Sequence, residues 1–175
     1  MMNYYNDGKL VIRPLIESDI PKLVEGFAAQ KWQKPRELFE EYYRRQKRNE
    51  QKMILAEKNG EVAGYVTLLP SANPGPYAAQ NFPEVVDFNV LIKYQRSGIG
   101  TKLMDVAEEL ATSYNRYVTL AVGLHYGYGA VQKMYVKRGY IPDGSGVWYK
   151  DQQLEQYAPC VNDDDLILYF IKALY

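Results

Sequence analysis

The chain has 175 residues, which is the size of one ordinary domain and is long enough to bury a hydrophobic core. Its 21 basic and 21 acidic side chains cancel, which leaves no electrostatic basis for binding nucleic acid or an anionic membrane surface. One cysteine and one histidine exclude an internal disulfide and a His/Cys zinc site, so we expect no metal cofactor.

The N-terminal sequence, MMNYYNDGKL, has neither the basic segment nor the apolar run of a secretion signal. No stretch of the chain approaches the ~20 apolar residues that a membrane-spanning helix needs. We therefore expect a cytoplasmic protein with no membrane partner. Tyrosine is unusually frequent, and because its ring packs while its hydroxyl bonds, tyrosine-lined pockets are expected.

The N-terminal segment is predicted to form a strand and then a helix. Residues 9–13 read as a short strand. The sequence at 17–21 has the composition of a helix start, with Ser18 or Asp19 as the cap, and the helix is expected to run to about Ala29.

A second helix and a hairpin follow. Pro35 precedes a helical pattern over 36–51 that has an aromatic and apolar face and a charged face. Residues 52–58 and 61–69 are strand-like and flank Asn59-Gly60, a pair that favours the positive φ angles of a tight hairpin turn.

Residues 70–83 are rich in proline and small residues, and we expect a surface loop long enough for a binding role. A central strand is predicted at 84–92. From Gly98 to Tyr114 the apolar residues follow helical spacing, which indicates an amphipathic helix.

The C-terminal part alternates between strands and one helix. The run at 116–124 is apolar and β-branched, as in a strand covered on both faces. A helix is predicted over 128–138, ending at Gly139. A strand follows that helix, then a turn at 162–165 and a final apolar strand from residue 166.

The junction at 93–103 has the composition of an anion-binding turn. Gly98 and Gly100 lie between an apolar strand and a long helix. Amides in the first turn of a helix lack intrahelical acceptors and carry partial positive charge, so they suit a pyrophosphate, and glycines let the backbone approach it. Glycines at such a turn also fit a purely structural role.

Two blocks of sequence resemble one known family. QRSGIG at 95–100 resembles the Q/R-x-x-G-x-G/A motif of the GNAT superfamily of acyl-CoA-dependent N-acetyltransferases, and FNV at 88–90 lies upstream, as does the family's cofactor-contacting strand. Residues 130–142, where Tyr135 precedes Gly139-Tyr140, resemble the family's second signature.

The resemblance implies a fold, a domain organisation and a cofactor. The fold would be α/β (α+β), with a GNAT-like mixed, mostly antiparallel sheet of six to seven strands splayed at the centre and flanked by about four helices. A single N-acetyltransferase domain would span residues 1–175 and use acetyl-CoA as co-substrate.

The cofactor contacts implied by the resemblance fall in two groups. Backbone groups of Phe88, Asn89 and Val90 would pair with the pantetheine arm. The pyrophosphate loop and its supporting residues would be Gln95, Arg96, Ser97, Gly98, Ile99, Gly100 and Thr101.

The resemblance also implies catalytic roles. Tyr135 matches the family tyrosine that protonates the departing thiolate, although a tyrosine on this helix face also fits a packing role. Many relatives have a glutamate base where this chain has Gly123, so Glu84 and Asp87 on the central strand are the candidates for proton relay, with Glu84 preferred. Many relatives have asparagine where Tyr128 stands.

The expected activity is direct transfer of an acetyl group to a primary amine of a small molecule or peptide. A covalent acyl-cysteine route is disfavoured because Cys160 has no neighbouring histidine in sequence. A non-catalytic acyl-CoA-binding sensor is the alternative, and the absent strand glutamate is compatible with it. The sequence does not select the amine, which could be an aminoglycoside, a polyamine, an amino-acid derivative or a protein N-terminus. It also leaves open whether the protein forms a homodimer.

Overall fold

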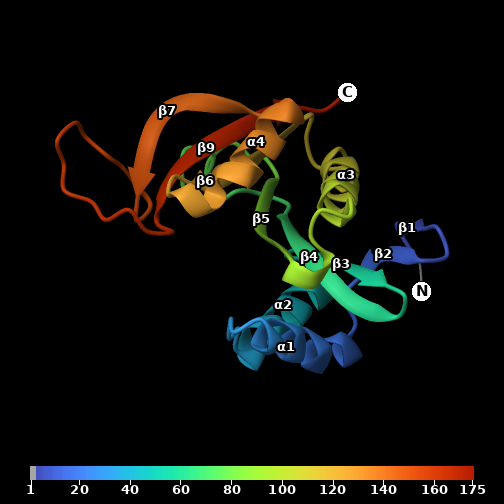
Figure 1. The fold of residues 1–175 in the computed structure, drawn as a ribbon. Helices are drawn as coiled ribbons and strands as arrows, with labels where there is room; N and C mark the ends of the chain where they lie inside the picture. The colour runs from blue at the N-terminus through green and yellow to red at the C-terminus, as the bar shows by residue number, and fades with distance from the viewer. Residues whose placement is uncertain (1–2) are drawn as a thin grey trace. The chain divides into compact units, whose positions relative to one another are not determined.

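The computed structural model describes residues 3–175 and divides the chain into two compact units (Figure 1). The first unit contains the chain up to Leu69 together with Val86–Leu110, and the second contains Pro70–Val85 and Ala111–Tyr175. The single domain expected over 1–175 stays a prediction.

The first unit contains the N-terminal hairpins and three helices. Its elements are β1 (Tyr5–Asn6), β2 (Leu10–Pro14), α1 (Ile20–Ala29), α2 (Arg36–Lys47), β3 (Lys52–Lys58), β4 (Glu61–Leu69), most of β5 (Glu84–Val90) and most of α3 (Ile99–Ala111). Strands β1 to β4 pair in sequence order and are antiparallel.

The second unit contains the C-terminal strands and one complete α-helix. Its elements are the start of β5, the end of α3, β6 (Tyr117–Gly123), α4 (Gly129–Lys137), β7 (Ile141–Tyr149), β8 (Gln152–Gln153) and β9 (Leu166–Ala173). Strand β6 pairs with β5 in parallel and with β9 antiparallel, and β9 pairs with β7.

The mixed, mostly antiparallel α/β fold with four α-helices is confirmed within residues 3–175. The strand number there is nine rather than six to seven. The two additional strands, β1 and β8, are two-residue pairings at sheet edges. Segments this short carry no alternating pattern from which a strand could be predicted.

The hairpin of β3 and β4 forms as predicted. Asn59 and Gly60 adopt φ angles of 51° and 84°. These two residues alone form the turn between Lys58 and Glu61, which pair across the hairpin. These strands form one side of the first unit's core. Phe27 of α1 and Phe39 of α2 pack on Tyr65 of β4, and all three side chains are fully buried. Full burial of each ring stabilises the fold by roughly 1.5–3 kcal/mol.

Two details of the helix ends differ from the sequence expectation. Neither Ser18 nor Asp19 caps α1 through its side chain; instead the Asp19 carboxylate accepts hydrogen bonds from the buried Arg13 guanidinium. Pairing that buried cation outweighs helix capping, since an unpaired buried charge is far more costly.

Helix α2 stops at Lys47 rather than 51, because Asn49 has a φ of 58°, which cannot continue a helix.

The long loop at 70–83 is more buried than expected for a surface loop. Its Ala72 and Tyr77 side chains form a small core with Tyr169 of β9. Ile167 and Ile171 pack against the same cluster, so alternate residues of β9 face the loop. This packing orders the segment that leads into the start of β5.

Candidate functional site

A tightly folded turn precedes α3 in the first unit. Arg96 and Gly98 have positive φ angles of 58° and 82°, so the chain reverses sharply before the helix begins. The Gln95 side-chain amide donates a hydrogen bond to the Val90 carbonyl oxygen at 3.0 Å, and the Ser97 hydroxyl donates to the Tyr94 carbonyl. These bonds fix the turn against the end of β5, where the N-terminus of α3, with the partial positive charge of a helix start, begins.

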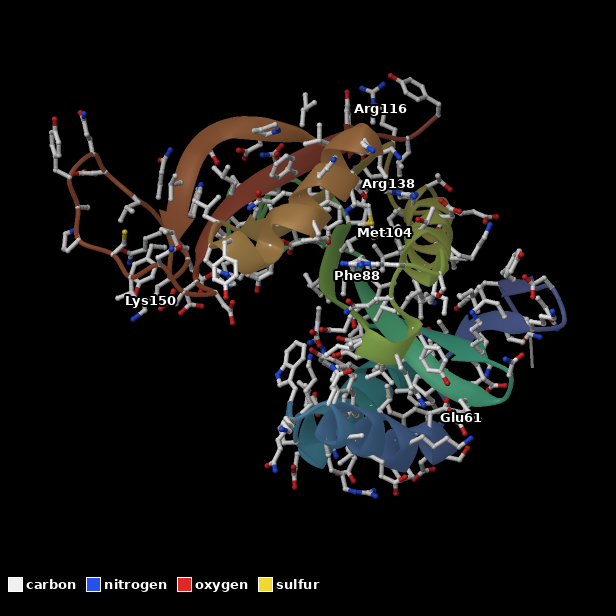
Figure 2. The ribbon with its side chains drawn as sticks, viewed as in Figure 1. Glu61, Phe88, Met104, Arg116, Arg138 and Lys150 are labelled. Carbon is white, nitrogen blue, oxygen red and sulfur yellow. The ribbon has the colours of Figure 1, made fainter. Side chains whose placement is uncertain are left out.

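The second glycine of the turn is closely packed. A Cβ atom at Gly100 would lie 3.1 Å from Cζ of Phe88 and 3.6 Å from a methyl of Val90. Phe88, labelled in Figure 2, therefore lies directly against the first turn of α3. By contrast, a Cβ at Gly98 would meet nothing within 4 Å, and the need for glycine there is its positive φ. The two glycines serve different physical purposes.

Asp87 is held in an unusual backbone conformation by four hydrogen bonds. Its φ is 45°, rare for a residue other than glycine. One carboxylate oxygen accepts from Lys34 at 2.8 Å and from Asn89 at 2.7 Å; the other accepts from Tyr42 at 2.9 Å and Tyr65 at 2.6 Å. Each oxygen thus accepts two hydrogen bonds, so both oxygens are engaged by donors of the protein.

Glu84 lies in the second unit and has a different environment. It starts β5 opposite Thr119 of β6 and is 6% exposed. Burial, with a smaller contribution from Asp151, raises the pKa of Glu84 to about 7. The pKa of nearby Tyr169 is raised to about 12 by burial and then by the Glu84 charge. A carboxyl group with a pKa near neutrality can take up and release protons under physiological conditions.

Tyr135 is on α4 in the same unit. Its side chain is buried, and its ring contacts that of Tyr140 with centroids 5.7 Å apart. Burial, and next the neighbouring Tyr128, raise the pKa of the Tyr135 hydroxyl well above its ordinary value of 10. The phenol therefore remains protonated at neutral pH and can act as a proton donor.

The two departures from the family pattern are physically connected. A Cβ atom at Gly123, at the end of β6, would overlap with the ring of Tyr128. The Tyr128 ring therefore occupies the space that a glutamate at position 123 would need. The Tyr128 hydroxyl donates to Asp164 at 2.9 Å, and the His125 Nε2 lies 3.0 Å from the same oxygen. The sequence predicts a turn at 162–165, and no spacing pattern signals this contact across 36 residues.

The sequence-predicted residues divide between the units. All the cofactor-binding candidates and Asp87 belong to the first unit, whereas Glu84 and Tyr135 belong to the second. Lys34, Tyr42 and Tyr65 were not predicted as site residues, but the structure brings them to Asp87.

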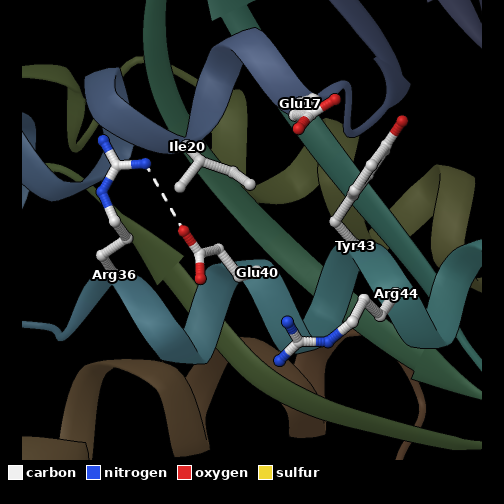
Figure 3. Close-up of a pocket in the computed structure, with 6 residues that line it drawn as sticks. All are labelled: Glu17, Ile20, Arg36, Glu40, Tyr43 and Arg44. Carbon is white, nitrogen blue, oxygen red and sulfur yellow. Dashed lines mark hydrogen bonds and ion pairs between the residues drawn. The ribbon is translucent and has the colours of Figure 1, made fainter.

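A separate surface pocket lies on the first unit between the start of α1 and the length of α2 from Arg36 to Arg44 (Figure 3). Its lining residues are Glu17, Ile20, Arg36, Glu40, Tyr43 and Arg44. Arg36 and Glu40 form an exposed ion pair at 3.5 Å across one side. The pocket contains none of the predicted site residues.

Within residues 3–175, no group of three or more metal-binding side chains occurs, and no helix is long and apolar enough to cross a membrane.

Comparisons with known proteins agree on one family. The model of the acetyltransferase (GNAT) family matches residues 20–140, whereas no curated protein matches the sequence. A GNAT acetyltransferase from Streptococcus pneumoniae has 18% identity and a TM-score of 0.68 over 95% of this chain and 100% of its own.

Two further solved structures are similarly distant. Ribosomal-protein-alanine N-acetyltransferase from Brucella melitensis has 18% identity and a TM-score of 0.66 over 93% of this chain and 99% of its own. The Salmonella typhimurium protein yncA, solved with its cofactor acetyl-CoA, has 14% identity and a TM-score of 0.68 over 96% of this chain and 95% of its own. At these identities the likeness shows a shared fold.

Proposed function

Because the chain belongs to the acetyltransferase (GNAT) family, we propose that it transfers the acetyl group of acetyl-CoA directly to a primary amine of a small molecule or peptide. The family uses acetyl-CoA, and a solved structure of the same fold contains it. An acetyltransferase activity follows from the family; the amine acceptor is the part that we propose.

The observation that carries the proposal is the turn between β5 and α3. Its reversed backbone at Arg96 and Gly98, and the close approach of Gly100 to Phe88, place the N-terminus of α3 beside the end of a strand. Amides and a helix dipole suit the pyrophosphate of acetyl-CoA, and the strand edge at 88–90 suits its amide-containing arm.

Acetyl-CoA supplies a thioester, whose acetyl group passes to the amine while its thiolate leaves. In this proposal Tyr135 donates its phenolic proton to the leaving sulfur. The buried phenol is protonated at neutral pH, so the proton is present when the sulfur leaves, while its raised pKa makes it a weaker acid than an exposed tyrosine.

The attacking amine must lose a proton, and we assign its relay to Glu84. Its pKa of about 7 allows the carboxylate to accept a proton, directly or through water, and return it to solvent. Asp87 is assigned a binding role, because four hydrogen bonds already occupy its oxygens. Because Gly123 stands where many relatives have a glutamate base, we assign the relay to another group.

A non-catalytic acyl-CoA sensor is the second candidate. The packing of Tyr128 into the space beside Gly123 favours it, because that packing removes the usual base. The protonated, buried Tyr135 favours the enzyme, since a sensor has no use for a proton donor. Turnover distinguishes the two.

The test is the release of free coenzyme A thiol from acetyl-CoA in the presence of a panel of amines. The panel contains aminoglycosides, polyamines, amino-acid derivatives and peptides with free N-termini, and mass spectrometry checks each product for one added acetyl group. We expect release that depends on both amine and protein. Tight acetyl-CoA binding without amine-dependent release would establish the sensor instead.

A further inference from the structure

The Lys34 side chain is buried, although it lies on a loop. It belongs to the segment between α1 and α2, yet its side chain is only 9% exposed. Its Nζ lies 2.8 Å from Oδ1 of Asp87 and 2.7 Å from the Tyr65 hydroxyl. Lysine ammonium groups normally extend into water, so burying this one requires a site that compensates for lost hydration.

Three aromatic rings complete that site. The Nζ of Lys34 lies 5.3 Å, 5.0 Å and 5.3 Å from the ring centroids of Phe27, Trp32 and Tyr65. These distances are within the range in which a ring face attracts a cation. A carboxylate combined with several ring faces is a general recognition site for ammonium groups. We call Phe27, Trp32, Tyr42, Tyr65 and Asp87 the ammonium cage.

Most of the cage is held in place without Lys34. Asp87 also accepts hydrogen bonds from Tyr42, Tyr65 and Asn89, which lie on α2, β4 and β5. Burial, and next the Asp87 charge, raise the pKa of both phenols, so both remain donors. Phe27 packs edge-on against Tyr65 with centroids 6.0 Å apart. Removing the Lys34 side chain therefore leaves a negative charge beside the rings of Phe27 and Tyr65, which a helix and a strand hold in place.

Lys34, the occupant of the cage, lies on the segment that connects α1 and α2. Residues 30–35 connect α1 and α2 without regular secondary structure, and Lys31 has a positive φ of 62°. Trp32, one wall of the cage, is 49% exposed, so the cage is adjacent to solvent. Connecting segments are in general more mobile than the helices and strands that they join, so an external ligand can displace Lys34 only by outcompeting its contacts with Asp87 and Tyr65.

We propose that the ammonium cage binds an external alkylammonium group and that Lys34 is a built-in competitor for it. In catalysis, which rests on the proposed function, a caged nitrogen is not the nucleophile. Beside a carboxylate and ring faces it keeps its proton, and an ammonium has no lone pair for attack. The acceptor therefore carries two amino groups, one caged and one acetylated, as diamines, polyamines and lysine-containing peptides do.

Binding is tested without turnover. The Lys34→Ala variant lacks three side-chain carbons and the ammonium group. The probe n-propylammonium has the same three carbons and charge, and n-propanol is its uncharged control. We expect millimolar n-propylammonium, but not n-propanol, to raise the Tm of Lys34→Ala by several degrees, with a smaller shift in the parent. Adding Asp87→Asn should abolish the shift. Equal responses to the two probes would overturn the proposal.

Lys34→Met guards against failure of the alanine variant to fold, because methionine keeps the apolar stem. Calorimetry should show n-propylammonium binding Lys34→Met about tenfold more tightly than the parent, since the charged competitor is gone. Equal affinity in the two proteins would contradict the competitor role.

Kinetics test the substrate class. With α,ω-diaminoalkanes, Lys34→Met should lower KM about tenfold while kcat stays within about twofold. With n-alkylamines of equal carbon number, which have no second amino group, kcat/KM should not change. A lysine that only fastens the loop would instead lower kcat for both series equally. Absence of turnover with every amine would refute the proposed function, while the propylammonium titrations would still decide the cage.

Discussion

The ring of Tyr128 fills the space that any side chain at Gly123 would occupy. Gly123 is buried at the end of β6, so an added methyl group cannot move into solvent. We expect Gly123→Ala to reduce the free energy of unfolding by about 1–3 kcal/mol, the usual cost of overpacking. Denaturant titration of the variant against the parent measures it.

Two controls separate overlap from a general effect of replacing glycine. Gly129→Ala, at the first residue of α4, adds a methyl group where nothing lies within 4 Å and should be neutral or stabilising. Combining Gly123→Ala with Tyr128→Ala should cost less than the sum of the single changes. Strictly additive costs would show that the Tyr128 ring is not what excludes a side chain at position 123.

A second glycine prediction concerns cofactor binding. Gly100→Val would drive a branched side chain into Phe88 and Val90 and displace the first turn of α3. We expect at least a tenfold weaker affinity for acetyl-CoA, measured by calorimetry, with the far-ultraviolet circular dichroism unchanged. If folded Gly100→Val bound acetyl-CoA as tightly as the parent, the 95–101 turn would not be the pyrophosphate site.

Local sequence patterns were sufficient where the structure depends on neighbouring residues. The Asn59-Gly60 hairpin and the amphipathic helix α3 followed from turn chemistry and from spacing. The contact between Lys34 and Asp87, 53 residues apart, carries no such local signal. The positive φ of Asp87 was equally unpredictable, because hydrogen bonds from distant residues stabilise it. Tertiary contacts of this kind define the part of the candidate site that the sequence did not reveal.

The pKa of Glu84 has a consequence for stability. In the folded protein it is about 7, against an ordinary value of 4.5, so the folded state binds this proton more tightly than the unfolded state does. The free energy of unfolding contributed by Glu84 therefore falls as pH rises from about 4.5 to about 7. Relative to the parent, Glu84→Gln should become more stable by roughly 3 kcal/mol between about pH 4 and about pH 8.

The matched control for that series is Glu25→Gln, which deletes the same charge at an exposed position on α1. Urea unfolding at several pH values gives the difference for each variant. If the change in the free energy of unfolding caused by Glu84→Gln equalled that caused by Glu25→Gln at every pH, burial would not raise the pKa of Glu84.

The same carboxyl group should control the pH dependence of acetyl transfer. If Glu84 accepts the amine's proton, kcat/KM of the parent should rise through an apparent pKa of about 7. Glu84→Gln should lower kcat/KM about 10²-fold near neutral pH and remove that step, with the smallest deficit at high pH, where free amine is abundant. A parental pH profile that survives the substitution would exclude Glu84 from the relay.

The last prediction separates cofactor binding from chemistry at Tyr135. Tyr135→Phe keeps the buried ring and its contact with Tyr140 but removes the proton donor. Acetyl-CoA affinity should stay within about twofold, while single-turnover transfer should slow by between about tenfold and about 10²-fold. Tyr126→Phe, which removes a hydroxyl from a 99% exposed side chain, should leave both quantities unchanged. An unaltered transfer rate in Tyr135→Phe would leave the hydroxyl without a catalytic role and would favour the acyl-CoA sensor.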